Sequence, residues 1–489
     1  MFRRLVVIVL VTACAAWTRT TLGQVSPFGG ESAYVADLAA RRRQVLQALG
    51  PETALVMWSA PPRVYSTDTN YEYRQESNLL YLTGVEQEDT ILVLAPGSGD
   101  AQEFLFVRRP DPFRELWFGH TLTTDEVTLR SGISRVYPEA GTEAFDAFMD
   151  RLLSDGVGGT PPSRVAILDR LTSQNASATP DQSDAAPHRA WLNALSGKHP
   201  GVSTLSAGDL LRRQRQVKTP YEQKLLARAA EISAEAHVAG MRAARPGRWE
   251  YEVEAAIEYV FLKNGAMSPG YPSIVASGPN SLVLHYETSS RQLQRGDLLL
   301  VDASGNYQGV TSDITRTYPV TGKFSPEQRT LYDLVLQAQD AGIAAAKPGA
   351  SPSDVTAAAS KVLASGLSTL GLIDASPAGA AQVSMWFPHS PIHGIGVDVH
   401  DPLGRLDPGA AFVVEPGLYI RPNALDDLPK TPENEALIAR LRPALDKFKN
   451  IGIRIEDSFL MTPTGPVMLS VRAPRRAIEI ERLVGTARD

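Results

Sequence analysis

The chain has 489 residues, of which 43% are hydrophobic and 21% charged, the balance of an ordinary globular protein. At roughly 150 residues per domain, this length predicts two or three domains and excludes a single small module. The 48 basic and 54 acidic residues give a net charge of −6, which favours neither nucleic acid nor an anionic membrane as a partner. The single cysteine, Cys14, excludes internal disulfide bonds, cysteine-ligated zinc and iron–sulfur clusters.

The N-terminus has the pattern of a secretory signal peptide. A basic start at residues 1–4 precedes an apolar stretch, 5–17, that is too short to span a bilayer. Cleavage before Gln24 would remove residues 1–23. Two alternatives stay open, a lipobox ending in a lipidated Cys14 and a retained anchor. We therefore expect an exported protein, periplasmic or secreted, without a membrane-spanning segment.

A smaller mixed α/β domain is expected over residues 30–212. It opens with a helix at 34–49, whose arginines Arg41, Arg42 and Arg43 we expect to be largely solvated. A segment rich in Ser, Thr, Asp, Pro and Gln, 172–188, predicts a surface loop. Short apolar runs predict strands at 53–59, 91–95, 104–108 and 166–169, and two helices are expected at 124–129 and 143–153.

The second domain is expected over residues 213–489. Thr219 and Glu222 form a capping box around Pro220, which predicts a helix that begins here and ends near residue 244. The stretch 421–450 looks like an insertion that carries its own helix, interrupted at Pro443. Further helices are expected at 250–264, 325–346 and 353–370.

Two aspartates flank a predicted β-hairpin in this domain. An apolar strand pattern runs into Asp302, a glycine-containing turn at 305–309 reverses the chain, and the next strand carries Asp313. A symmetric hairpin would bring the two side chains face to face, about 4.5–5.5 Å apart, where like charges are destabilising. Such a pair is stable when a cation lies between the carboxylates or when one is protonated. The alternative is a pair of solvated aspartates at the edge of the turn, although the strand before Asp302 is very apolar for such an exposed position.

Two more acids and a group of histidines complete the candidate site. Taken singly, each is more often a surface acid or a satisfied polar group than a ligand. One histidine with four carboxylates would form an oxygen-rich site for two divalent metals about 3.5–4 Å apart, and this chemistry suits Mn²⁺ better than structural Zn²⁺. A site of this kind activates water and polarises a carbonyl group, as amide hydrolysis requires. The residues are Glu415 and Glu456, which lie in strand patterns, and His389, His393 and His400, which fall within a thirteen-residue segment.

With these motifs, the chain resembles the Xaa-Pro aminopeptidase/prolidase family of pita-bread metallopeptidases. The resemblance runs from about residue 71 to the C-terminus and implies an α/β fold, with a smaller N-terminal domain before a pita-bread catalytic domain. It implies release of the N-terminal residue from peptides with proline in second position. The motifs that carry the resemblance lie at 73–78, 116–119, 274–278, 284–286, 313–317, 393–401, 414–419 and 454–457.

The resemblance also implies roles for individual residues. In the family pattern, Asp313 and Glu456 would bridge the two metals and Glu415 would shuttle the proton of the attacking water. Trp117 of the first domain would reach the active site of a neighbouring subunit, which implies a homo-oligomer, a dimer or a tetramer. The expected metal ligands are Asp302, Asp313, His393, Glu415 and Glu456. The substrate site would be lined by His285, His389, His400, Arg454 and Tyr271, with His400 nearest the scissile carbonyl.

One departure from the family pattern concerns His389, and three alternative functions stay open. Ser390 and Pro391 follow His389 where the family has other residues, and proline fixes φ and removes a donor. The alternatives are a prolidase restricted to Xaa-Pro dipeptides, a methionine aminopeptidase and a non-catalytic pita-bread binding protein. The methionine enzyme lacks a large first domain of this kind, and the intact set of ligand types argues against the binding protein.

Overall fold

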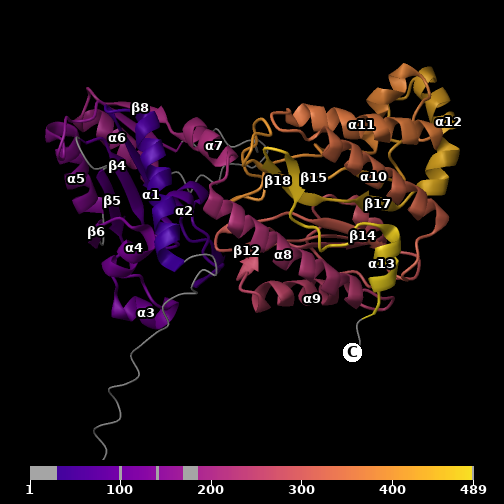
Figure 1. Cartoon of the computed structure of the whole chain (residues 1–489), viewed down its shortest axis with the longest axis horizontal. Coiled ribbons are helices and arrows are strands. Elements are labelled where there is room, and N and C mark those ends of the chain that lie inside the picture. The colour runs from indigo at the N-terminus through magenta and orange to yellow at the C-terminus, as the bar shows by residue number, and fades with distance from the viewer. Residues whose placement is uncertain (1–29, 98–101, 139–141, 169–185, 487–489) are drawn as a thin grey trace, which may run out of the picture.

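The computed structural model describes residues 30–97, 102–138, 142–168 and 186–486. Figure 1 shows two α/β parts side by side, the first in indigo and magenta and the second in rose, orange and yellow. The expected signal peptide, 1–23 with Cys14, lies outside the described residues, as does most of the expected loop 172–188, of which the end belongs to a helix. Within the described ranges, no helix is long and apolar enough to cross a membrane.

The first part is built on one six-stranded mixed sheet. The strand order is β6-β5-β4-β1-β7-β8, antiparallel at β1–β4 and β4–β5 and parallel elsewhere. The strands are β1 Thr53–Trp58, β4 Ile91–Ala95, β5 Gln102–Val107, β6 Arg135–Pro138, β7 Arg164–Ile167 and β8 Ser203–Ser206, and β2 Val64–Ser66 pairs with β3 Thr69–Asn70 in a separate hairpin.

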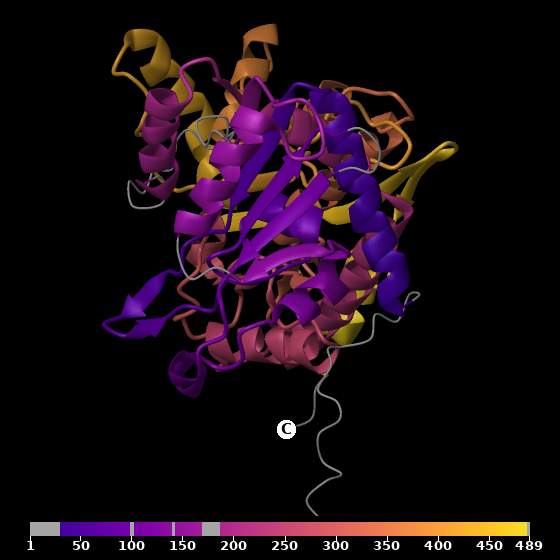
Figure 2. The same ribbon diagram turned by 90° about the vertical axis from the view of Figure 1, so that its left-hand side faces the viewer.

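Helices cover both faces of this sheet, and Figure 2 shows the sheet with helices on its two sides. Alternate residues of β1 join different cores, with Leu55 on the side of α1 and Val56 on the side of α5. The helices are α1 Gly30–Leu49, α2 Ser77–Thr83, α3 Pro112–Phe118, α4 Thr124–Ser131, α5 Thr142–Asp155, α6 Ala186–Lys198 and α7 Gly208–Gln216.

The expectation that the arginines of the first helix are solvated is wrong for two of the three. Arg41 and Arg42 are only 4% and 0% exposed. Arg41 donates to the Tyr81 carbonyl at 2.9 Å, and Arg42 pairs with Glu103 at 2.9 Å. Both side chains lie between α1 and its neighbours. Burial is tolerated there because the guanidinium groups pair with carbonyl and carboxylate groups that an apolar side chain would leave unpaired.

The second part is a pita-bread fold in which strands lie between two pairs of helices. In Figure 1, α10 and α11 lie above the strands and α8 and α9 below them. The helices are α8 Pro220–Ala243, α9 Glu250–Lys263, α10 Pro326–Ala345, α11 Pro352–Thr369, α12 Pro432–Phe448 and α13 Ala477–Leu483, with 3-10 turns η2 Gly278–Leu282 and η3 Pro377–Met385. This arrangement confirms the expected fold class.

The strands of the second part form several small antiparallel sheets. One sheet has the order β10-β11-β14, a second β13-β12-β9, a third β15-β18-β19, and β16 pairs with β17. The strands are β9 Ser268–Pro269, β10 Ile274–Ser277, β11 Leu298–Asp302, β12 Gly305–Tyr307, β13 Val310–Thr311, β14 Thr315–Pro319, β15 Ala411–Val414, β16 Gly417–Ile420, β17 Ile451–Arg454, β18 Asp457–Thr462 and β19 Gly465–Met468.

Two helix predictions in this part have different outcomes. The capping box is present as predicted: the Thr219 hydroxyl accepts from the backbone of Glu222, whose side chain accepts in return from Thr219 N–H. The predicted interruption at Pro443 is wrong, because α12 continues through this proline. Leu441 and Leu445, two residues before and two residues after this proline, are buried and hold the helix against the domain.

The connection between the two parts runs through α7. The predicted domain boundary at 212/213 falls inside this helix. The division of the chain into domains at this point stays a prediction. Arg215 of α7 is 4% exposed and donates to the Asn78 side chain of α2 at 2.8 Å. The same guanidinium binds Asp398 in the second part at 2.6 Å, so partly buried polar contacts join the two parts.

Candidate metal centre and active site

Asp302 and Asp313 belong to one hairpin, but they are not opposite each other. Asp302 ends β11 and pairs with Thr315 of β14. The turn falls on Gln308 and Gly309, with φ values of 52° and 81°, the left-handed backbone of a two-residue hairpin turn. The predicted symmetric register is therefore wrong. The turn is centred one position later than expected, and Asp313 lies in the irregular segment between β13 and β14.

The two carboxylates nevertheless converge. The Tyr271 hydroxyl lies 2.7 Å from Asp302 Oδ1 and 2.5 Å from Asp313 Oδ1, so one phenol binds both acids. Arg454 at the end of β17 pairs with Asp302 Oδ2 at 2.6 Å. Tyr271 and Arg454 thus hold the two aspartates in position. The two carboxylates therefore belong to one site, although the hairpin register differs from the predicted one.

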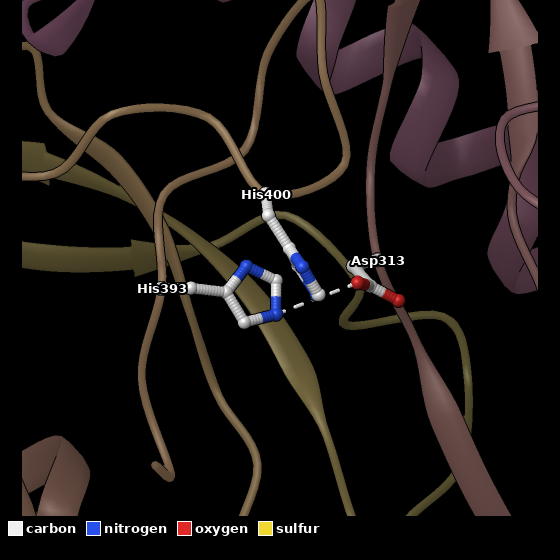
Figure 3. A group of neighbouring side chains, drawn as sticks. All are labelled: Asp313, His393 and His400. Atoms are coloured by element: carbon white, nitrogen blue, oxygen red, sulfur yellow. Dashed lines mark ion pairs between the residues drawn. The ribbon is translucent and has the colours of Figure 1, made fainter. Parts of the chain in front are cut away.

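Glu415, Glu456 and His393 complete this cluster from other elements. Glu415 follows β15 and Glu456 lies between β17 and β18. His393 Nε2 lies 3.3 Å from Glu415 Oε1, 3.6 Å from Asp313 Oδ2 and 3.7 Å from Glu456 Oε1. All five expected metal ligands are therefore gathered in one place, and Figure 3 shows the histidine and Asp313 pointing toward each other.

The donor set fits divalent cations. Three groups of side chains have ligand atoms within 4.8 Å of one another: Asp302–Asp313–Glu456, His393–Glu415–Glu456 and Asp313–His393–His400. Two of them share Glu456, a geometry that suits two metals joined by bridging carboxylates. Glu456 Oε1 is buried and has no hydrogen-bond partner within the described structure, an unpaired acceptor that a cation would satisfy.

The protonation equilibria also reflect a surplus of buried negative charge. Burial, and then the neighbouring aspartates, raise the pKa of Asp313 and of Glu456 well above the usual range. Burial lowers the pKa of His393, but the Glu415 and Glu456 carboxylates together outweigh this effect and raise that pKa to about 9. Protons on these groups and divalent cations are alternative ways of supplying the positive charge that the cluster requires.

The ring of His393 is oriented by a backbone hydrogen bond. Its Nδ1–H donates to the Gly394 carbonyl at 3.0 Å, which leaves Nε2 directed at the carboxylates. His400 packs edge-on against His393 with ring centroids 4.3 Å apart, and Figure 3 shows its ring next to His393 and Asp313. Although His400 is exposed at the surface, partial desolvation of its ring, together with the nearby His393 and His285, lowers its pKa to about 4, so the ring is neutral near pH 7.

His389 is held in place by a short chain of hydrogen bonds. Its Nε2 lies 3.0 Å from the Tyr419 hydroxyl, which accepts from Arg454 Nη1 at 2.9 Å. His389 Nδ1 lies 3.7 Å from Glu415 Oε2. The Ser390-Pro391 departure therefore leaves the histidine beside the site, and the Pro391 carbonyl accepts from Glu415 N–H at 2.8 Å.

Tyr419 and Thr315 also belong to the site, although no role was predicted for either residue. Tyr419 connects His389 to Arg454, and the Thr315 hydroxyl donates to Glu456 Oε2 at 2.8 Å. Both lie in motifs that carried the family resemblance, at 414–419 and 313–317. Their position in those motifs was the available signal, but a hydroxyl group does not indicate by itself which carboxylate or histidine it will contact.

His285 and Trp117 differ in their relation to the site. His285 is exposed after η2, where the neighbouring Leu284 carbonyl accepts a 3.5 Å contact from Arg454 Nη2. Trp117 is 67% exposed on α3, which lies at the lower end of the first part in Figure 1, and its ring is edge-on to Phe113. The structure thus places His285 at the rim of the site, and a single chain does not bring Trp117 to it.

The fold and the clustered ligands define a two-domain metallopeptidase, and the comparisons with known proteins agree. Residues 38–156 match the model of the aminopeptidase P N-terminal domain, and residues 224–463 match metallopeptidase family M24. The Xaa-Pro aminopeptidase of Escherichia coli (strain K12) is 33% identical over 466 residues, which cover 92% of this chain and 97% of that protein. That of Haemophilus influenzae is 30% identical, covering 93% and 99%.

Solved structures agree with the sequence relatives. Pseudomonas aeruginosa aminopeptidase PepP superposes with a TM-score of 0.78 at 32% identity, covering 92% of this chain and 97% of that one. A Zn-substituted E. coli aminopeptidase P in complex with product gives a TM-score of 0.77 at 31% identity, covering 93% and 99%. The chain therefore belongs to the Xaa-Pro aminopeptidase family and is a metalloaminopeptidase. The alternatives of a prolidase, a methionine aminopeptidase and a non-catalytic protein are not favoured.

Proposed function

We propose that this metalloaminopeptidase releases the first residue of peptides that carry proline in second position. The observation that carries the proposal is the convergence of five ligand side chains in two groups that share Glu456, whose buried Oε1 has no hydrogen-bond partner in the described structure. The relatives named Xaa-Pro aminopeptidase, which match this chain over more than nine-tenths of its length, support the choice of substrate.

The proposed cofactor is a pair of divalent ions, Mn²⁺ in preference to Zn²⁺. Asp302, Asp313, His393, Glu415 and Glu456 would hold the pair, with Asp313 and Glu456 as the bridging residues. Bound metals supply Lewis acidity, which activates water and polarises the scissile carbonyl. The preference for Mn²⁺ rests on the excess of carboxylate over imidazole donors.

The side chains around the metal ligands have proposed roles in catalysis. Glu415 would accept and deliver the proton of the attacking water, since its carboxylate borders both His389 and His393. His400 would donate a hydrogen bond to the developing oxyanion, and its placement over the cluster supports this role. Arg454, which is expected to line the substrate site, would also keep Asp302 and Tyr419 in position.

Specificity for proline would come from the walls of the site. Proline lacks an N–H group, so a protease that positions substrates by hydrogen-bonding that group needs a different means of recognition. His285, His389, His400 and Tyr271 would surround the ring, while Asp302 would bind the free N-terminal amine. Attack would then be limited to the first peptide bond.

The test is cleavage of matched tripeptides by the mature protein reconstituted with Mn²⁺. Xaa-Pro-Xaa should lose its first residue, while Xaa-Ala-Xaa and an N-acetylated Xaa-Pro-Xaa should remain almost intact. A dipeptide, Xaa-Pro, separates this activity from that of a prolidase. Equal rates on the proline and alanine tripeptides would show that the proposed proline pocket is wrong.

We also propose that the protein is exported and that it forms a homo-oligomer. The basic and apolar N-terminal pattern supports export, and mass spectrometry of the mature N-terminus distinguishes a start at Gln24 from a lipidated Cys14. An intact Met1 on cytoplasmic protein would contradict both. The exposed apolar side chains of α3, including Leu116 at 77% and Trp117 at 67%, support an oligomer. Light scattering after size exclusion measures the oligomeric state.

A further inference from the structure

The segment 393–401, which we call the histidine loop, carries His393 at its start and His400 near its end. It is closed by its own backbone, since Asp401 N–H donates to the Gly394 carbonyl at 2.9 Å and Gly396 N–H to the Asp398 carbonyl at 3.0 Å. These bonds close residues 394–401 into a compact loop, so contacts on its far side bear on the segment that carries His400 and adjoins His393.

Two buried cations hold Asp401 in this loop. One carboxylate oxygen pairs with Arg215 of α7 and the other with Lys218, and the three side chains are 1%, 4% and 1% exposed for Asp401, Arg215 and Lys218. Lys218 also donates to the Arg215 carbonyl at 2.6 Å, which ties the two cations together. Breaking such a buried pair leaves an uncompensated charge, so the arrangement resists displacement.

Asp398 is held in a different way, by residues from the first part of the chain. Arg215 binds its Oδ2 at 2.6 Å, while the Ser77 hydroxyl and Arg74 bind its Oδ1 at 2.6 and 3.1 Å. Asp398 N–H in turn approaches Asp401 Oδ1 at 3.3 Å. The first part thus contacts the same loop that presents the histidines to the metal site.

The packing around these contacts leaves little freedom. A Cβ added at Gly396 would lie 2.5 Å from Asp401 Oδ2 and 2.7 Å from Lys218 Nζ, closer than real Cβ atoms approach such groups. Thr311 N–H donates to the Gly396 carbonyl at 2.8 Å, which links the loop to the hairpin between the two aspartates. The ion pairs and the loop backbone therefore form one packed unit.

We propose that Asp398 and Asp401 are positioning residues that act through the histidine loop, so that docking of α2 and α7 sets the placement of His393 and His400. This inference rests on the proposed function for the consequence in catalysis, but the structural part does not depend on the substrate. It makes the first domain a component of the catalytic site within a single chain.

The test uses Asp398→Asn in the full-length mature protein. Asp398 is 38% exposed at its side chain, and the Arg215–Asp401 pair survives the change, so the variant should fold. Asp398→Glu restores the charge and serves as the rescue variant. The matched control is Asp374→Asn, which removes a partly buried aspartate whose partners are Ser376 and Arg440, outside the histidine loop.

The kinetic readout is the division of the effect between kcat and KM. At saturating Mn²⁺, Asp398→Asn should lower kcat about tenfold and change KM by less than about threefold. Asp398→Glu should recover most of the loss, and Asp374→Asn should stay within about twofold of the parent. In a His400→Gln background, the further effect of Asp398→Asn should be smaller than in the parent, because the share that acts through the His400 ring is already lost and only the share that acts through His393 remains.

A second readout does not need activity. In metal-free protein, hydrogen exchange of peptides covering 393–401 should speed up about tenfold in Asp398→Asn and remain unchanged in the control. Unchanged exchange of the 393–401 peptides in Asp398→Asn would overturn the positioning role. If hydrogen exchange of 393–401 differs between Asp398→Asn and the wild type as expected, but the wild type does not cleave Xaa-Pro-Xaa, the positioning role stands and the proposed function is contradicted.

Discussion

Asp313 illustrates how a single buried carboxyl depends on its neighbours. Its Oδ1 accepts from the Tyr271 hydroxyl at 2.5 Å, and its Oδ2 lies 3.6 Å from His393 Nε2. It is only 4% exposed, and burial next to Asp302 raises its pKa well above the usual range. A carboxylate in such surroundings is ionised at neutral pH only if a cation compensates its charge.

Asp313→Asn tests this dependence. The amide has one oxygen fewer and cannot bridge two cations, so kcat should fall by about two orders of magnitude or more, and metal content should drop below the two ions expected per chain. Elemental analysis and tripeptide hydrolysis measure the two effects. Circular dichroism should remain that of the parent. Normal turnover in this variant would remove Asp313 from the set of ligands.

His237 of α8 gives a prediction about stability and pH. It is fully buried, with Nε2 3.0 Å from the Ala303 carbonyl, and burial, assisted by Arg316, lowers its pKa from 6.5 to about 4. The unfolded chain therefore takes up a proton at a higher pH than the folded chain. The stability associated with the neutral ring is complete above about pH 6.5 and is lost as the pH falls toward 4.

The corresponding variant is His237→Gln, whose amide keeps a donor for Ala303 and does not titrate. Between pH 7.5 and pH 5, the free energy of unfolding of the parent should fall by about 2 kcal/mol more than that of the variant. Urea denaturation of metal-free protein at the two pH values measures this difference. Parallel pH profiles for the two proteins would contradict the assignment.

At the scale of elements, α12 shows that a proline need not end a helix. Pro443 cannot donate to the carbonyl one turn earlier, and this loss costs up to about 3 kcal/mol in a helix interior. The helix persists because Leu437, Leu441 and Leu445 are buried on the opposite face. Tertiary packing therefore overrides the local signal in this segment.

Pro443→Ala should accordingly stabilise the protein. Pro443 is exposed, so alanine removes no packing, and it restores a backbone donor in the middle of α12. The gain should be about 1–2 kcal/mol, less than the full penalty because proline also restricts the unfolded chain. Thermal unfolding measures the shift, with Ala444→Gly as a variant expected to lower the Tm. A lower Tm for Pro443→Ala would show that the helix depends on the ring.

Some helices and strands could be predicted from the sequence, and others could not. The expected β4 agrees with the structure in both bounds, because a short apolar run between turn residues has few alternatives. The helix α3 was missed, since an exposed, aromatic-rich stretch has no periodic apolar face. Burial of Arg41 and Arg42 was also missed, because their partners Tyr81 and Glu103 are distant in the chain.

The candidate site divides in a similar way. The five ligand types and their motifs could be read from the sequence, but the hairpin register depended on which residues occupy the positive-φ turn. Tyr419 and Thr315 contact the site only after β14, β16 and β17 have come together. Contacts of this kind are set by tertiary packing and leave no local pattern in the chain.

At the scale of the whole molecule, metal binding should stabilise the fold. The proposed ligands come from the hairpin after β11, from the histidine loop and from the ends of β15 and β17, so a bound ion pair links distant segments. Chelation should lower the Tm of the second part by roughly 5–10 °C, and added Mn²⁺ should restore this Tm. Asp313→Asn is the control and should respond weakly. An unchanged Tm on complete metal removal would contradict this linkage.

The hairpin between Asp302 and Asp313 also bears on the order of events during folding. The two aspartates can approach each other once a short turn closes, whereas Glu415 and Glu456 must arrive from far along the chain. A nascent hairpin therefore offers only part of the ligand set, and tight metal capture waits for the late, non-local contacts. Mn²⁺ should then leave the refolding rate nearly unchanged while slowing unfolding, so that metal loaded after folding extends the lifetime of the native enzyme.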